Sequence, residues 1–161
     1  MDLIECKNEL IEYAKFLHNS SKEPSFIMSE LFRIGMIYLD KYDGYYDENK
    51  NSLLLKVDVK GTKYERRAEI IEKLKIGDKI DIIRDNTNEY NSNNFIVLSN
   101  RYNIGVLQKK LCNLLAPLFD NDYITSIDSR VSYVEPLLKR SVFASEAIVF
   151  VELIIQFKNS N

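Results

Sequence analysis

The segment that follows Val59 combines positive charge with an aromatic ring, a combination that suits the binding of nucleic acid. It reads Lys60-Gly61-Thr62-Lys63-Tyr64-Glu65-Arg66-Arg67. Single-stranded nucleic acid is held by aromatic side chains, on which each base stacks with about 1 to 3 kcal/mol, and by cations that neutralise phosphates. The same run is also typical of a helix start with solvated charges and a tyrosine in the core. The segment on its own therefore leaves both interpretations open.

A second candidate segment, residues 86–94, holds five asparagines and no aliphatic residue, so we expect an exposed loop. Asparagine side chains can bind a ligand, but they also tolerate left-handed backbone conformations and hydrogen-bond their own main chain. A loop that is simply shaped by its asparagines is therefore an equal interpretation. Tyr90, in the middle of the segment, can stack on a base or plug the mouth of a barrel.

Residues for nucleophilic or general-base catalysis are scarce. His18 is the only histidine, and no nucleophile motif such as G-x-S-x-G accompanies it. The five glycines form neither a G-x-G-x-x-G pattern nor a phosphate-binding loop. Cys6 and Cys112 belong to no C-x-x-C pair, and we expect both to behave as small buried hydrophobes.

The candidate metal ligands have simpler explanations. Asp58 and Lys60 lie two residues apart on a predicted strand, which is a faint version of a nuclease site but also an ordinary ion pair on a solvated face. Asp120 and Asp122 match a turn that ends a helix. We therefore expect no metal site, no cofactor and no enzymatic activity.

Charge and hydropathy restrict the class of protein further. A formal net charge of −2 argues against a protein that coats nucleic acid by bulk electrostatics, so any nucleic-acid site must be local. No apolar run approaches the roughly 20 residues of a membrane-spanning helix. Residues 1–5 carry acid where a secretory signal carries base. We expect a cytoplasmic protein that does not associate with membranes.

Residues 1–52 are predicted to form an N-terminal helical extension. Asp2 can cap a helix that runs to Leu17, since its apolar residues recur at three- and four-residue steps. A loop follows, and residues 29–38 are ambiguous between helix and strand; we interpret them as a short helix and a short strand. Residues 40–52 are predicted to be a turn or long hairpin at the subdomain boundary.

Residues 53–161 are predicted to form a β-rich domain. Alternating apolar residues predict strands over 53–60, 79–84, 95–99, 102–106, 123–133 and 143–157. Helical periodicity appears over 65–74, with Gly77 as the expected C-terminal cap, and over 108–119, where Pro117 should bend or shorten the last turn. The class is therefore α+β, a small, partly open β-barrel with two inserted helices.

Four short motifs follow one another along this domain. They are Gly61-Thr62-Lys63-Tyr64; Leu74-Lys75-Ile76-Gly77-Asp78; Arg84 with Asn88-Glu89-Tyr90-Asn91-Ser92-Asn93-Asn94-Phe95-Ile96-Val97; and Ile104-Gly105-Val106-Leu107 followed by Lys109. In this order and spacing the chain resembles the HIRAN domain family, a small OB-like β-barrel module of DNA-remodelling, helicase-like proteins and of stand-alone bacterial or phage-type proteins. Each motif alone is weak, and their order makes the resemblance specific.

The resemblance implies a module that captures the 3′ end of single-stranded DNA, in DNA repair, replication or phage-related DNA metabolism. It implies that Tyr64 and Tyr90 stack on or flank the terminal bases, and that Lys63 and Lys109 meet phosphates. Asn91 would hydrogen-bond the terminal hydroxyl, and Asn93 belongs to the same binding loop. For this to hold, the asparagine-rich loop and the lysine-tyrosine segment must meet in one exposed pocket.

Two positions depart from the family pattern. Asn91 replaces an aspartate, which adds a hydrogen-bond donor and removes a charge. Val106 stands where the family often has histidine or tyrosine, so one polar or aromatic contact is missing. The alternative function is a protein-interaction module without nucleic-acid binding, whose N-terminal helix and barrel groove hold a partner chain; the acidic net charge favours it.

Overall fold

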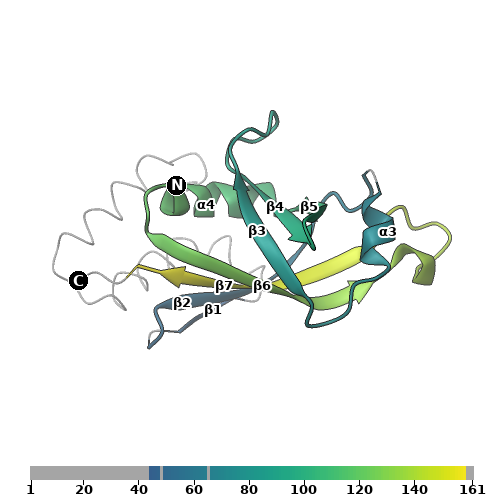
Figure 1. Ribbon diagram of the computed structural model, residues 1–161, viewed down its shortest axis with the longest axis horizontal. Coiled ribbons are helices and arrows are strands. Elements are labelled where there is room, and N and C mark those ends of the chain that lie inside the picture. Colours follow the sequence, from purple (N-terminus) through teal and green to yellow (C-terminus); the bar gives the residue numbers. More distant parts are fainter. Residues whose placement is uncertain (1–43, 48, 65, 159–161) are drawn as a thin grey trace.

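The fold is built on an antiparallel sheet. The computed structural model describes residues 44–47, 49–64 and 66–158, and within these ranges seven strands pair in the order β1-β2-β7-β6-β3-β4-β5 (Figure 1). The strands are β1 (Tyr45–Asp47), β2 (Ser52–Asp58), β3 (Lys79–Asp85), β4 (Asn94–Ser99), β5 (Tyr102–Val106), β6 (Ile124–Glu135) and β7 (Ile148–Phe157). The predicted helix at the N-terminus and the segment 29–38 lie outside the described residues. Because β1 pairs with β2 through the expected hairpin, the sheet begins before residue 53.

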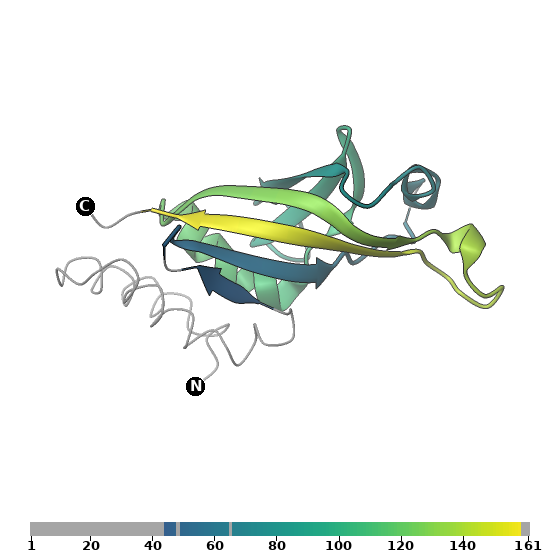
Figure 2. The same cartoon turned by 90° about the horizontal axis from the view of Figure 1, so that it is seen from below.

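Three neighbouring strands, β2, β7 and β6, lie side by side along the long axis of the molecule (Figure 2). Successive side chains of a strand point to opposite faces, so every second residue of β7 is buried. The strand predicted over 143–157 was placed too early, since β7 begins at Ile148. The preceding residues form a loop in which the Arg140 guanidinium donates to the Glu146 carbonyl and the Ala144 amide donates to the Ser141 carbonyl.

The sheet curls into a partly open barrel, as predicted. β3 pairs with β6 through Lys79 and Ile80 and with β4 through its remaining residues, so it joins the two halves of the sheet. At the far edge, the amides of Lys60 and Val106 each donate to the other's carbonyl at 2.9 Å. This isolated bridge connects the segment after β2 to β5 without a continuous ladder. Gly105 permits it, because a Cβ there would lie 2.4 Å from the Lys60 carbonyl oxygen.

The long helix α4 (Lys109–Asp120) matches the helix predicted from the leucine pattern. Its apolar side packs into the core through Leu111, Cys112, Leu114, Leu115 and Leu118. Of the two effects expected of Pro117, a bend or a shortened last turn, the shortening does not occur, since the helix continues to Asp120. The Asn121 amide then donates to the Pro117 carbonyl at 2.7 Å, which satisfies one of the free carbonyls at the helix end.

The first inserted helix, α3 (Arg67–Ile71), is shorter than the predicted 65–74. After Ile71 the amides of Lys73 and Leu74 bond carbonyls three residues back, so the chain tightens out of the α-helix. Gly77 does not cap the helix, because Glu72 does. With φ of +93°, Gly77 instead lies in the turn before β3, where its amide donates to the Val131 carbonyl at 2.8 Å.

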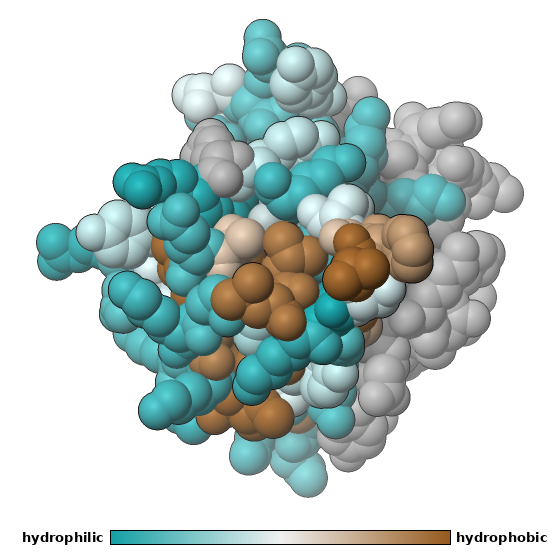
Figure 3. Space-filling model, turned by 90° about the vertical axis from the view of Figure 1, so that its right-hand side faces the viewer, coloured by the Kyte–Doolittle hydropathy of each residue, from teal (hydrophilic) through white to brown (hydrophobic). Residues whose placement is uncertain are grey.

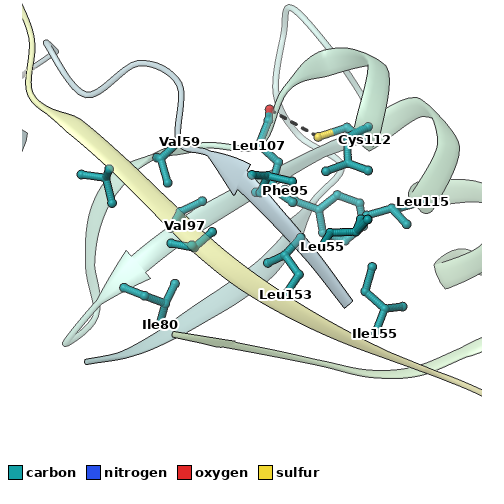
Figure 4. Packing of buried hydrophobic residues seen from close by; sticks show 14 of the residues in the cluster. Leu55, Val59, Ile80, Phe95, Val97, Leu107, Cys112, Leu115, Leu153 and Ile155 are labelled. Carbon is teal, nitrogen blue, oxygen red and sulfur yellow. Dashed lines mark hydrogen bonds between the residues drawn. The ribbon is translucent and has the colours of Figure 1, made fainter. Parts of the chain in front are cut away.

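The core lies between the inner face of the sheet and α4 (Figure 4). Leu55, Phe95 and Leu153 contribute from three strands, and Cys112 and Leu115 contribute from the helix. Cys112 is fully buried as predicted, and its thiol donates to the Leu107 carbonyl at 3.5 Å. Burial raises the pKa of this thiol from 9.0 to about 11, because the thiolate would lose its hydration. Cys6 lies outside the described residues.

The loop between β6 and β7 carries apolar side chains in solvent. Leu138, in the short 3₁₀ helix Leu137–Lys139, is 84% exposed, and Val142 and Phe143 are each 93% exposed. Figure 3 looks at the end of the molecule that bears this loop and α3, and it shows apolar residues gathered there. Among the helices that the structure describes, none has the length and apolar content needed to cross a membrane.

Candidate nucleic-acid interface

The chain turns sharply after β2 and thereby presents Tyr64 to solvent. Gly61 has φ of +73°, and the Thr62 hydroxyl donates to the Ala147 carbonyl at 3.0 Å, which anchors the turn to the start of β7. Arg67 closes the turn, since its Nη1 donates to the Gly61 carbonyl at 2.7 Å. Tyr64 is 56% exposed, with the Lys63 ammonium 5.4 Å and the Arg67 guanidinium carbon 6.0 Å from its ring centroid. A ring flanked by two cations is suited to a stacked base with its phosphate.

The asparagine-rich loop between β3 and β4 is held at its base by Arg84. One nitrogen of this guanidinium donates to the carbonyls of Ser92 and Asn94, at 2.7 and 3.2 Å. The other two donate to the two carboxylate oxygens of Asp120 in α4, both at 2.9 Å. The guanidinium carbon also lies 5.6 Å from the Phe95 ring centroid. Arg84 appeared in the sequence motif but was not among the predicted site residues, because its partner Asp120 is distant in sequence.

Asp85 adds a second fixed point at the base of this loop. Its carboxylate accepts from the Thr87 hydroxyl at 2.7 Å, from the Thr87 amide at 3.1 Å and from the Asn94 side chain at 3.4 Å. The Thr87 hydroxyl is the largest of the causes that lower the pKa of Asp85, and it outweighs the opposing effect of burial.

The asparagines of the loop mainly shape its backbone. The Asn88 Oδ1 accepts from the amides of Tyr90 and Asn91, both at 2.9 Å, and the Asn91 Oδ1 accepts from the Asn93 amide at 3.1 Å. These local bonds hold the loop without a regular ladder. Asn93 bonds the Asn113 side chain of α4 at 3.0 Å. The result is a fixed loop that projects from the barrel (Figure 1) and leaves Tyr90 84% exposed.

The two segments meet in one open pocket with a volume of about 840 Å³. Its described lining residues are Lys60, Gly61, Tyr64, Arg67, Asn88, Tyr90, Asn91, Asn94, Val106, Leu107 and Lys109. Four predicted site residues are therefore brought together: Tyr64, Tyr90, Asn91 and Lys109. Lys63 and Asn93 do not line the pocket; Lys63 lies beside the Tyr64 ring and Asn93 faces α4. The Lys60–Val106 bridge brings the basic segment 60–67 to this pocket. Lys60 and Arg67, the two ends of that segment, line the pocket although they were not among the predicted site residues.

The pocket lining carries three cations, Lys60, Arg67 and Lys109, and none of its described residues is a carboxylate. Lys60 is paired with Asp58 at 2.6 Å, and Asp58 also accepts from Gln108 at 3.0 Å, so the predicted ordinary ion pair is present. Lys109 is exposed and forms no ion pair with a described residue. In the part of the chain that the structure describes, no three His, Cys, Asp or Glu residues cluster in a way that could hold a metal.

The sheet forms an open barrel, and helix α4 covers its core. An isolated bridge, between Lys60 and Val106, connects its edges. This architecture is that of an OB-like domain. The HIRAN domain family matches residues 53–148, more than half of the chain, and the chain belongs to this family. HIRAN domains are nucleic-acid-binding modules and are not catalytic by themselves.

Two solved structures share the fold. The HIRAN domain of human HLTF superposes with a TM-score of 0.50 and 21% identity, over 65% of this chain and 76% of that one. A protein from Lactobacillus plantarum superposes with a TM-score of 0.51 and 16% identity, over 65% of this chain and 97% of that one. No curated protein matches the chain in sequence.

Proposed function

We propose that this chain binds the free 3′ end of single-stranded DNA in the pocket between the asparagine-rich loop and the segment after β2. The observation that supports this most directly is that two exposed tyrosines, Tyr64 and Tyr90, line the same cationic pocket. Stacking on both rings would hold terminal bases, and base stacking is tolerant of sequence because every base has an aromatic face.

In this proposal each polar residue has a distinct role. Lys109 and Lys63 neutralise phosphates, with Arg67 as a further cation beside the Tyr64 ring. Asn91 hydrogen-bonds the terminal group of the strand. Asn93 acts indirectly, since its bond to Asn113 holds the loop against α4.

The proposed biological setting is DNA repair, replication or phage-related DNA metabolism, in the cytoplasm and without a catalytic step. Ends of single strands are exposed in all of these processes. Residues 53–161 are the proposed binding domain. The segment 1–52 is the proposed contact for a protein partner, although its strand β1 pairs with β2.

The test compares linear with circular single-stranded DNA of one sequence, each with an internal fluorophore, by fluorescence anisotropy at two salt concentrations. We expect the linear strand to bind at least tenfold more tightly at low salt, because only it has an end to enter the pocket. A linear strand whose terminal nucleotide lacks the 3′ hydroxyl should bind more weakly than the intact strand. Equal affinity for linear and circular DNA would reject end recognition. Strands should also remain intact with added magnesium, and cleavage would instead support the nuclease interpretation.

A protein-interaction module is the second candidate function. The exposed side chains of Leu138, Val142 and Phe143 favour it, because exposed apolar patches mark interaction surfaces. The acidic net charge of −2 favours it as well. Failure of every oligonucleotide to bind, at either salt concentration, would support this candidate over DNA binding.

A further inference from the structure

The described charged residues that line the pocket are all cations. Lys60, Arg67 and Lys109 line it, and its described lining residues include no carboxylate. Lys60 is offset by Asp58, which leaves Arg67 and Lys109 as cations without a carboxylate partner among the described residues. Arg67 uses Nη1 to bond the Gly61 carbonyl, while its Nη2 donates to no described acceptor. The pocket therefore offers positive charge and free N–H donors to whatever enters it.

Asn91 lines the pocket, and the hydrogen bonds of its side chain show which polar atoms remain for a ligand. Its Oδ1 is already occupied, since it accepts the Asn93 amide at 3.1 Å. This bond also settles the orientation of the side-chain amide, because a backbone N–H needs an oxygen acceptor. The Asn91 Nδ2 donates to no described acceptor, so its two N–H groups are what the side chain can offer to a ligand.

An aspartate at position 91 would act in the opposite way. One of its carboxylate oxygens could keep the bond to the Asn93 amide, and the other would present a negatively charged acceptor, which suits a hydroxyl donor and repels an anion. Asparagine presents donors and no charge. A phosphate monoester carries about −1.5 to −2 charge at pH 7 and offers strong acceptor oxygens, so it matches both the donors and the cations.

We propose that the pocket prefers a DNA strand whose 3′ end carries a terminal phosphate over one that ends in a free hydroxyl. This inference rests on the proposed function and names the chemistry of the end group that the same site accepts. The terminal phosphate receives hydrogen bonds from the Asn91 Nδ2 and is neutralised by Lys109 and Arg67.

The experiment measures dissociation constants of the full chain by anisotropy for four strands of one sequence, each with an internal fluorophore. These are a linear strand with a 3′ hydroxyl, the same strand with a 3′ phosphate, a strand with a 5′ phosphate and a 3′ hydroxyl, and a circular strand. We expect the 3′ phosphate to lower the dissociation constant about tenfold relative to the hydroxyl, which is the size of one added charge-assisted hydrogen bond. The 5′ phosphate should leave it unchanged.

Asn91→Asp is the matched variant, because it keeps the size of the side chain and an acceptor for the Asn93 amide. It should reverse the preference, so that the hydroxyl strand binds more tightly than the phosphate strand. Lys109→Gln provides a second variant in case Asn91→Asp alters the loop, and it should reduce the preference at least threefold. Circular dichroism melting checks that both variants are folded.

The outcomes separate the two proposals. A preference for the 3′ phosphate below threefold in the unaltered chain overturns the further inference, and so does a preference that Asn91→Asp and Lys109→Gln both leave unchanged. If the strand with the 3′ hydroxyl binds more tightly than the strand with the 3′ phosphate, and the circular strand binds weakly, end recognition is supported and only the phosphate preference fails. If no strand binds, both proposals fail together.

Discussion

At the scale of single residues, the same side chains shape the loop and could meet a ligand. The side-chain oxygens of Asn88 and Asn91 accept hydrogen bonds from backbone amides, as asparagine side chains commonly do in turns. The side chain of their neighbour Tyr90 does not shape the loop in this way, since it is 84% exposed. A tyrosine that is held in solvent by a fixed loop can stack on a base without a large ordering cost.

Replacing Tyr90 with alanine tests this role. Tyr90→Ala should weaken binding of single-stranded DNA by about 1 to 3 kcal/mol, the value of one stacked base, and should leave the melting temperature nearly unchanged. Tyr102→Ala is the control, because Tyr102 is 63% exposed and lines a different hollow beside α3. A large drop in melting temperature would show that Tyr90 supports the core, and an equal loss of affinity in the control would show that binding does not use this pocket.

Cys112 makes stability depend on pH in the alkaline range. Its folded-state pKa of about 11 lies above the ordinary 9.0, because burial disfavours the thiolate. The native state therefore holds this proton more tightly than the unfolded state does. The contribution to stability is complete below about pH 9 and is lost as the pH rises toward 11.

Thermal melting between pH 8 and 11 should show a steeper loss of stability for the unaltered chain than for Cys112→Ala. The quantity compared is the slope of melting temperature against pH. The absolute values are not compared, because Cys112→Ala also leaves a small cavity, and lysines and tyrosines titrate in both proteins. Parallel slopes would mean that the thiol ionises as easily in the folded state as in the unfolded state.

At the scale of elements, Arg84 couples strand β3, the loop and helix α4. Its planar fork bonds two loop carbonyls and both oxygens of Asp120, a geometry that lysine cannot reproduce. The pocket thus depends on residues that do not line it. The loop has its conformation because the end of α4 lies beside the base of the loop.

Asp120→Asn should loosen the loop with little effect on global stability. Asp120 is 42% exposed, so the loss in stability should stay below about 1 kcal/mol. Hydrogen exchange of amides in residues 86–94 should become faster, and DNA affinity should fall a few-fold. Asp81→Asn is the control, because it breaks the exposed pair with Lys79 at the other end of β3. Unchanged exchange in the loop would show that the Arg84–Asp120 pair is not what fixes it.

At the scale of the whole molecule, the charge distribution is uneven. The net charge is −2, yet the pocket lining carries three cations, Lys60, Arg67 and Lys109. A protein of this kind should bind few phosphates, since most of its surface does not attract DNA. Because few phosphates are contacted, the affinity for DNA should depend only weakly on salt concentration.

We expect the logarithm of the DNA association constant to fall with the logarithm of salt concentration with a slope of about −1.4 to −2.1, corresponding to two or three phosphates on a single strand. Lys109→Gln should make this slope shallower by about 0.7. Lys110→Gln should not, because Lys110 is exposed at the neighbouring position but does not line the pocket. Equal slopes for the two variants would show that Lys109 does not meet a phosphate.

Most elements of the described barrel follow from local patterns in the amino-acid sequence. Strands over 79–84, 95–99 and 102–106 were predicted to within one residue of β3, β4 and β5, because alternation of buried and exposed side chains is a local property. Helix α4 followed from its leucine spacing for the same reason. The predictions failed where local signals are ambiguous. Helix α3 ends early because the amides of Lys73 and Leu74 bond carbonyls three residues back. In the loop before β7, the Arg140 side chain bonds the Glu146 carbonyl.

The convergence of the candidate site residues on one pocket depends on long-range contacts. The bridge between Lys60 and Val106 and the pair between Arg84 and Asp120 join residues that are far apart in the chain, and no periodicity encodes such pairings. These contacts bring Tyr64 and Tyr90 to one pocket and leave Lys63 and Asn93 outside its lining. The residue types that suit nucleic acid are visible in the sequence, whereas their convergence depends on how the sheet curls, which is set by packing of the whole core.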